Sequence, residues 1–132
     1  MEQKIKRGDY ITYSEGAKKY SVSIQTFRRM AAKAEAVYKQ NHHSLVNVKQ
    51  FEKFLELFKV GDVMPSNQDI MREIMKRNNS VWVRYDEGAW LYSMSRNMFM
   101  KLAADAGALY KIYGVTLINT LILDYHLESF RI

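Results

Sequence analysis

The sequence has no cysteine, a single proline and no long apolar run, and two of these absences exclude whole classes of protein. Without thiols, a disulfide framework, a thiolate metal site and a cysteine nucleophile are ruled out. No stretch approaches the roughly 18 apolar residues that a membrane span needs, and the charged segment 1–9 is followed by no apolar run. We therefore expect a cytoplasmic protein that has no membrane partner.

Catalytic signatures are missing as well. The chain has no phosphate-binding glycine loop, no serine nucleophile elbow and no cluster of histidine and carboxylate at catalytic spacing. Glu15 and Glu87 lie near predicted helix starts, where a carboxylate is favoured by the positive end of the helix dipole. We expect no enzymatic activity, no catalytic residue, no cofactor and no small-molecule substrate.

The main positive feature is an internal repeat. Residues 10–60 align without a gap with residues 82–132, at an offset of 72. The residues of the first copy that recur unchanged are Tyr13, Glu15, Gly16, Ala17, Tyr20, Ser21, Ser23, Phe27, Ala31, Ala32, Ala34, Ala36, Tyr38, Lys39, Leu45, Asn47, Leu55, Glu56 and Phe58. Positions that are apolar in both copies are predicted to be buried, and positions that differ are predicted to be exposed.

Charge is divided unequally between the two copies. The net charge of +6 suits a polyanionic partner without requiring one. Residues 1–60 carry 12 basic and 6 acidic side chains, whereas residues 82–132 carry 5 of each. The first copy is therefore expected to supply most of the affinity for phosphate.

Each copy predicts the order strand, helix, helix, hairpin, helix. Ser14, or Asp86 in the second copy, is expected to cap a first helix that runs to about residue 20. Ser23, or Ser95, is expected to cap the second helix. The apolar positions of that helix form one stripe, which we expect to be buried: Phe27, Met30, Ala31 and Ala34.

The second helix is expected to end near Ala34 or Ala106, since Gly107 suits a left-handed helix terminus. Glu35 holds the equivalent position in the first copy and would cost about 1 kcal/mol relative to glycine in that geometry. Two β-prone runs, 36–39 and 45–48, predict a hairpin with a loop at 40–44. Helical spacing returns over 48–60 and 120–132.

This order is typical of a small winged helix-turn-helix in which the hairpin is the wing. Residues 13–23 and 85–95 share the pattern Tyr-(Ser/Asp)-Glu-Gly-Ala-x-x-Tyr-Ser-x-Ser, followed by an alanine-rich helix. With the wing, this pattern resembles the excisionases of conjugative transposons and their relatives with a small MerR-like DNA-binding domain. The resemblance implies a DNA-bending accessory factor for recombination or a small transcription regulator.

We thus predict an α+β, mainly α chain with two tandem winged helix-turn-helix units, at 8–60 and 81–132, joined by a connector at 61–80. In the connector, residues 66–69 fit a capping box at the start of a helix. The apolar face of this helix consists of Ile70, Met71, Ile74 and Met75. That face either packs against the units or forms a surface for another protein.

The outward face of the second helix carries the candidate DNA-binding residues of the first copy. With the apolar stripe turned inward, this face consists of Gln25, Arg28, Arg29 and Lys33. Arginine pairs with guanine, glutamine with adenine, and lysine contacts phosphate. The alternative is a solvated charged face, but the helix-turn-helix order favours insertion of this face into the major groove.

The corresponding surface of the second copy is less basic. Its residues are Arg96, Asn97, Met100, Lys101 and Asp105. Lys33 is replaced by the acidic Asp105 and Arg28 by Met100. We expect this copy either to bind DNA more weakly or to contact a protein.

The predicted wing of the first copy contains Asn41, His42 and His43, which suit contacts to a phosphate backbone or a minor groove. Because the chain has no cysteine and only one further histidine, His126, this pair is better explained as an exposed loop than as a metal site. No metal site is expected.

The sequence therefore predicts a protein that binds double-stranded DNA sequence-specifically. A recombinase or a second copy of the chain would fit as protein partners. The alternative is a protein-interaction module that keeps the same fold and uses the second copy as its surface, through Met94, Met98 or Met100, which we expect to be exposed.

Overall fold

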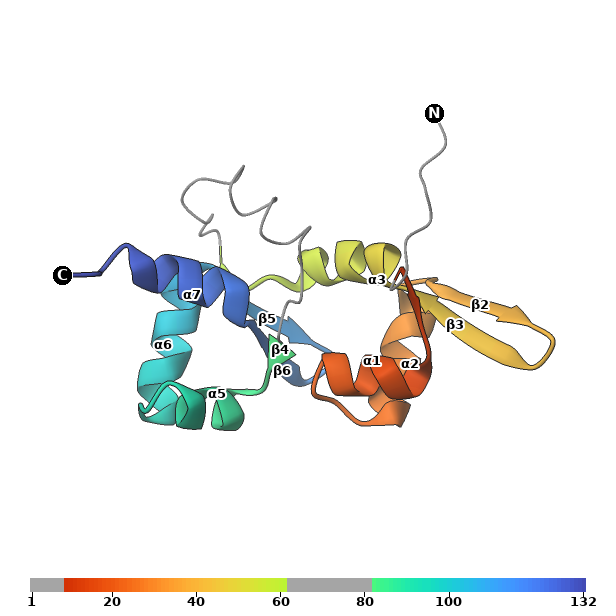
Figure 1. The fold of residues 1–132 in the computed structure, drawn as a ribbon, viewed down its shortest axis with the longest axis horizontal. Coiled ribbons are helices and arrows are strands. Elements are labelled where there is room, and N and C mark those ends of the chain that lie inside the picture. Colours follow the sequence, from red (N-terminus) through yellow and green to blue (C-terminus); the bar gives the residue numbers. More distant parts are fainter. Residues whose placement is uncertain (1–8, 62–81) are drawn as a thin grey trace, which may run out of the picture. The chain divides into compact units, whose positions relative to one another are not determined.

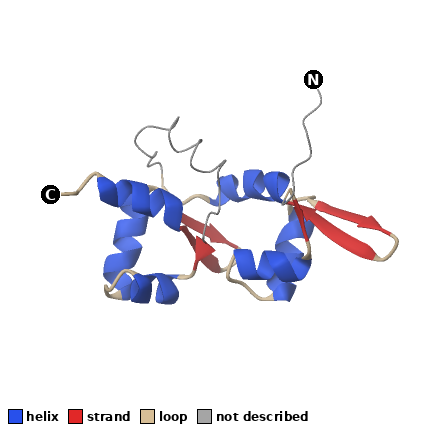
Figure 2. Cartoon of the chain, viewed as in Figure 1, coloured by secondary structure: helices blue, strands red, loops and turns tan. Residues whose placement is uncertain are grey.

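In a computed structural model, the described residues 9–61 and 82–132 belong to two compact units that divide between Leu57 and Phe58. Within the described residues, each unit holds three α-helices and one three-stranded antiparallel sheet (Figures 1 and 2). The chain is thus an α+β protein with two similar halves. The predicted connector helix lies outside the described residues.

The first unit contains the predicted order of elements. Its elements are β1 (Tyr10–Ile11), α1 (Tyr13–Lys19), α2 (Ile24–Lys33), β2 (Val37–Gln40), β3 (His43–Asn47) and α3 (Val48–Leu55). The 3₁₀ turn η1 (Glu56–Phe58) follows α3 and contains the boundary between the two units. The sheet order is β1-β3-β2, with both pairs antiparallel, so β2 is an edge strand.

The second unit repeats this order. Its elements are β4 (Trp82–Val83), α5 (Tyr85–Leu91), α6 (Arg96–Ala106), β5 (Leu109–Ile112), β6 (Val115–Asn119) and α7 (Thr120–Glu128). The sheet order is β4-β6-β5. No helix among the described residues has the length and apolar character needed to cross a membrane.

The core of the first unit is built on the predicted apolar stripe of α2. Phe27, Met30, Ala31 and Ala34 are all buried, as the spacing predicts. The Phe27 ring lies 5.6 Å from the Tyr20 ring and 5.0 Å from the Phe51 ring, measured between centroids. This aromatic cluster joins α2 to the end of α1 and to α3.

Helix caps show where the sequence was read correctly and where it was not. Ser23 and Ser95 cap α2 and α6, as predicted, since their hydroxyls accept backbone hydrogen bonds from Thr26 and Met98. The prediction for α1 was wrong: Thr12, not Ser14, is the N-cap. Its hydroxyl accepts from the Glu15 N–H at 3.1 Å, and the Glu15 carboxylate accepts from the Thr12 N–H at 2.9 Å.

In the second copy, the position of Thr12 is taken by Arg84, which makes no capping bond with its side chain. Asp86, the predicted cap of this helix, lies in the first turn instead. The Thr12 N–H and hydroxyl hydrogen bonds lower the pKa of the Glu15 carboxyl. The capping box thus distinguishes the start of α1 from the start of α5.

The predicted loop at 40–44 is shorter than expected. β2 and β3 extend to Gln40 and His43, and a two-residue turn at Asn41 and His42 joins them. Both turn residues have a positive φ, 50° and 69°. Such a turn matches the right-handed twist of paired strands, which allows the strands to pair up to the turn.

The last helix of each unit ends earlier than its spacing predicts, at Leu55 in α3 and at Glu128 in α7. In the chain that follows α3, Lys59 forms an antiparallel bridge with Tyr110 of β5. Residue 59 is therefore extended, because pairing with a sheet edge requires extended backbone. The helical spacing beyond Leu55 therefore gave a wrong prediction for residue 59, because it does not take the pairing with Tyr110 into account.

A tyrosine–carboxylate hydrogen bond recurs in both units. The Tyr20 hydroxyl donates to Glu52 Oε1 at 3.0 Å, and the Tyr92 hydroxyl donates to Asp124 Oδ1 at 2.5 Å. Burial raises the pKa of both tyrosines, and the neighbouring carboxylate raises it further. This bond holds the last helix of each unit against the end of the first helix.

Replacing Glu35 by glycine is expected to stabilise the first unit by about 1 kcal/mol. Glu35 and Gly107 end α2 and α6 in the same left-handed conformation, with φ of 54° and 73°. A side chain is strained there, and glycine is not. Urea unfolding measures the gain; the reciprocal change Gly107→Ala should lose stability, and a loss in Glu35→Gly would contradict this reading of the backbone.

Candidate functional site

The outward face of α2 is a set of four polar side chains opposite the buried stripe. Gln25, Arg28, Arg29 and Lys33 are all exposed. Ser23 starts the helix, and because Phe27, Met30 and Ala31 point inward, the helical period turns these four outward. No acidic side chain lies on α2, so this face carries three positive charges and no negative charge along one helix.

Part of this face is hollowed. Gln25, Thr26, Arg28, Arg29 and Ala32 line an open hollow of about 550 Å³. The Arg28 guanidinium lies 5.6 Å from the centre of the Tyr13 ring, which is close enough for a cation–π contact. Tyr13 therefore orients Arg28 from α1, a role that the sequence reading did not assign to this tyrosine.

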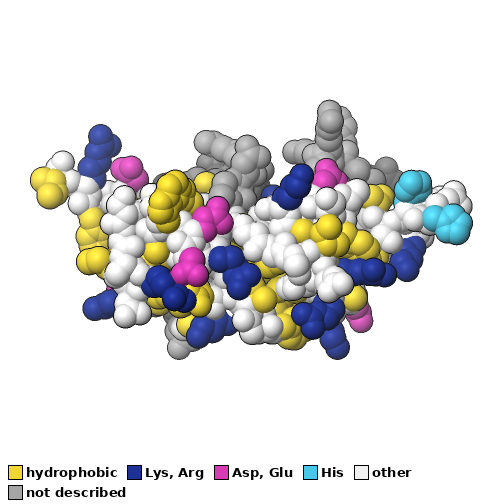
Figure 3. Space-filling model, turned by 90° about the horizontal axis from the view of Figure 1, so that it is seen from below, with side chains coloured by type: hydrophobic (Ala, Val, Ile, Leu, Met, Phe, Trp, Pro, Cys, Tyr) yellow, Lys and Arg dark blue, Asp and Glu magenta, His cyan; other side chains and the backbone are white. Residues whose placement is uncertain are grey.

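The β2–β3 hairpin carries the other predicted residues of the first unit. Asn41, His42 and His43 are exposed at its turn, and the hairpin extends beyond α2 and α3 (Figure 1). Cyan histidine side chains stand at the end of this hairpin in Figure 3. Lys39, nearer to the body of the unit, is exposed as well.

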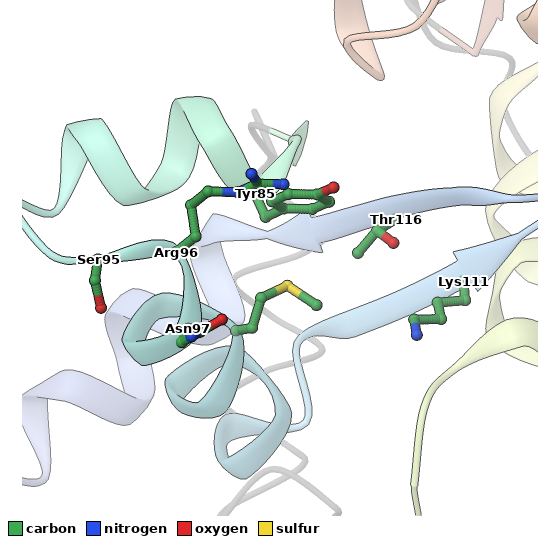
Figure 4. Close-up of a pocket in the computed structure, with 7 residues that line it drawn as sticks. Tyr85, Ser95, Arg96, Asn97, Lys111 and Thr116 are labelled. Carbon is green, nitrogen blue, oxygen red and sulfur yellow. The ribbon is translucent and has the colours of Figure 1, made fainter.

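In the second unit, helix and hairpin contribute to one surface. An open hollow of about 600 Å³ is lined by Tyr85, Ser95, Arg96, Asn97, Met100, Lys111 and Thr116. Figure 4 shows that Arg96 and Asn97 enter it from the start of α6, while Lys111 and Thr116 come from β5 and β6. Predicted residues Arg96 and Asn97 are thus brought together, whereas Lys101 is exposed but does not line the hollow.

Lys111 and Thr116 were missed by the sequence reading. Lys111 and Thr116 lie opposite each other on the β5–β6 hairpin, and Lys39 and Ser44 hold the same register in β2–β3. Lys111 could have been predicted from its identity with Lys39. Most surface positions differ between the two copies, whereas this lysine is the same in both.

The charge of Arg96 is compensated within its own unit. Its Nε atom lies 2.7 Å from the Asp86 carboxylate, and its guanidinium lies 4.5 Å from the centre of the Tyr85 ring. Arg28 of the first unit stacks on the equivalent tyrosine but has a polar serine, Ser14, where the second unit has Asp86. The second unit therefore offers less free positive charge, in addition to the change from Lys33 to Asp105.

The second unit also exposes apolar side chains where the first unit is polar. Trp90, Leu91 and Met98 are 79%, 50% and 63% exposed. Their counterparts in the first copy are Lys18, Lys19 and Thr26. Met94 and Met100, which the alternative prediction also placed on this surface, are partly buried against the core of the second unit.

The sequence profile of the Family of unknown function (DUF6462) matches the chain twice, at residues 8–58 and at residues 80–130. The two matches contain the residues that line both hollows. No curated protein and no solved structure matches the chain. Among the described residues, no group of three or more histidine, aspartate or glutamate side chains is arranged to hold a metal ion.

Proposed function

The chain belongs to the DUF6462 family through both of its units, and on that premise we propose that it binds double-stranded DNA through the outward face of α2. In this proposal each unit is a winged helix-turn-helix of the small MerR-like kind, α2 lies in the major groove and β2–β3 is the wing. The protein then serves as an excisionase-like accessory factor for recombination or as a small transcription regulator.

One observation supports the proposal: the side chains of α2 that point away from the core are of the types that can bind base edges and phosphates of DNA. Arg28 and Arg29 offer bidentate donors for guanine, and Gln25 offers the donor and acceptor that match adenine. Lys33, at the other end of the same face, adds a charge for phosphate. A helix that only faces solvent usually mixes acidic and basic side chains, whereas this face of α2 has no acidic side chain.

The packing of α1 against α2 supports the same proposal. Gly16 lets the Phe27 ring approach the backbone of α1, so the two helices cross at close range. A short segment, residues 20–23, joins them. Short crossed helices with the second one exposed are the arrangement in which a recognition helix stands clear of its own unit.

Selection of bound duplexes from random DNA tests the function directly. We expect enrichment of a short site whose affinity falls at least about 10-fold between 50 and 200 mM salt, as for roughly two neutralised phosphates. Lys33 and Lys39 are the exposed cations of α2 and β2 that would make these contacts, while Arg28 and Arg29 contact bases. Failure to enrich any site, with no duplex binding at low salt, would overturn the proposal.

A second function has one observation in its favour, namely the exposed Trp90, Leu91 and Met98 of the second unit. Exposed apolar side chains at positions that are polar in the first copy suit a protein partner. Trp90→Lys should then abolish a protein interaction while leaving DNA binding through α2 unchanged. Loss of DNA binding in this variant would assign the surface to DNA instead.

A further inference from the structure

The outer edge of β5 in the second unit is covered by a short extended segment, residues 58–60. Lys59 forms an antiparallel bridge with Tyr110, and the Val60 N–H donates to the Leu109 carbonyl at 2.9 Å. The Phe58 ring lies 5.5 Å from the Tyr113 ring at the hairpin turn. Residues 58–60, which follow α3 in the chain, therefore act as an added strand of the second unit.

The repeat contains this segment twice. Phe58-Lys59-Val60 aligns with Phe130-Arg131-Ile132, and each follows the last helix of its copy. Phe130 is 64% exposed and Ile132 is fully exposed. Both Phe130 and Arg131 contact the preceding helical turn: the Phe130 ring lies 5.1 Å from the His126 ring, and Arg131 Nη1 lies 3.8 Å from Glu128 Oε2.

The matching edge exists in the first unit. β2 is the edge strand of the order β1-β3-β2, and no strand of the described chain pairs with its outer side. Tyr38, the counterpart of Tyr110, is 49% exposed, whereas Tyr110 is fully buried. Because Tyr38 pairs with Leu45 in the hairpin, the backbone groups of its neighbours Val37 and Lys39 point outward.

We propose that residues 130–132 of one chain add as a strand to the outer edge of β2 in a second copy of the chain. The register follows from the second unit: Arg131 lies opposite Tyr38, and the Ile132 N–H donates to the Val37 carbonyl. Such strand addition satisfies the open backbone groups of an edge strand. The segment and the edge are different surfaces of the same chain, so the association is head-to-tail and joins chains into a closed ring or an open array.

One contact of the second unit has no counterpart in this association. The turn residue Tyr113, which contacts Phe58, is replaced by Asn41 in the first unit. The association is therefore weaker than the pairing within the chain, and it increases with protein concentration. Binding of several copies to neighbouring sites on one duplex would raise the local concentration and favour it.

Cysteine cross-linking tests the register, because the natural chain has no cysteine. A chain that carries both Tyr38→Cys and Arg131→Cys places two thiols opposite each other across the proposed strand pair, within the range of a disulfide. In a glutathione redox buffer, where only well-placed pairs persist, we expect disulfides that join residue 38 of one chain to residue 131 of another, in closed rings or in a ladder of longer species. Each single variant should stop at the dimer.

The matched control carries Lys49→Cys with Arg131→Cys, since Lys49 is exposed on α3 and belongs to no strand. The same cross-linked species in this control, no disulfide between residues 38 and 131 of different chains in the test chain, or cross-links only within one chain would overturn the proposal. Sedimentation velocity without cross-linking gives a second measurement: removal of residues 130–132 should abolish concentration-dependent association. No DNA is present in either experiment, so failure here is distinct from failure of the proposed function.

Discussion

Replacing Gly16 by alanine is expected to destabilise the first unit by about 3 kcal/mol, the upper end of the usual cost of an overpacked core. A Cβ at residue 16 would lie 2.0 Å from the Phe27 ring. That ring cannot move away, because it is fully buried between Tyr20 and Phe51. A unit of this size has little stability to lose, so we expect its native fraction to fall sharply.

Chemical denaturation followed by circular dichroism measures this loss. Lys18→Ala on the same helix is the control, since Lys18 is exposed and the change leaves the core untouched. Adding Phe27→Leu should recover part of the stability that Gly16→Ala removes, because the smaller side chain leaves room for the new methyl group. Equal stability of Gly16→Ala and the natural chain would show that α1 and α2 are not held this closely.

The order of elements could be predicted because burial repeats with the helical period in both copies. Phe27 and Ala31 recur as Phe99 and Ala103, and all four are fully buried. The serine before each second helix ends a Tyr-Ser-x-Ser segment that breaks the helical pattern, and this made the cap recognisable. Comparison of the two copies thus showed which apolar positions are buried, which the pattern of one copy alone does not show.

The element ends could not be predicted as well, because they depend on local competition and on distant contacts. Thr12 and Ser14 are both good caps, and only the reciprocal bond with Glu15 distinguishes them. The hairpin turn lacks the Asn-Gly signal, yet Asn41 and His42 adopt the left-handed conformation.

The candidate site was predictable on one helix and not across elements. Once the buried positions of α2 are known, the helical period gives its exposed positions, so the four polar residues could be predicted from the sequence. The contact of Arg28 with Tyr13, and the pairing of Arg96 with Asp86, join residues of two helices. Neither spacing within a helix nor composition contains that information.

The double variant Arg28→Ala, Arg29→Ala is expected to weaken DNA binding by about 100-fold or more, since each arginine that contacts a base contributes about 1–3 kcal/mol. Both side chains are exposed on α2, a helix that carries no acidic side chain. Fluorescence anisotropy on the selected duplex measures the change. The slope of log affinity against log salt should also fall if either arginine contacts phosphate.

Two controls separate recognition from net charge. Lys49→Ala with Lys53→Ala removes the same charge from exposed positions of α3, and we expect a smaller loss there. Arg96→Ala with Lys101→Ala removes it from the second unit, where the Arg96 charge is already paired with Asp86, so this loss should also be smaller. Equal losses of DNA affinity in all three double variants would show that binding depends only on net charge. Unchanged affinity in the α2 variant would show that α2 does not contact the DNA.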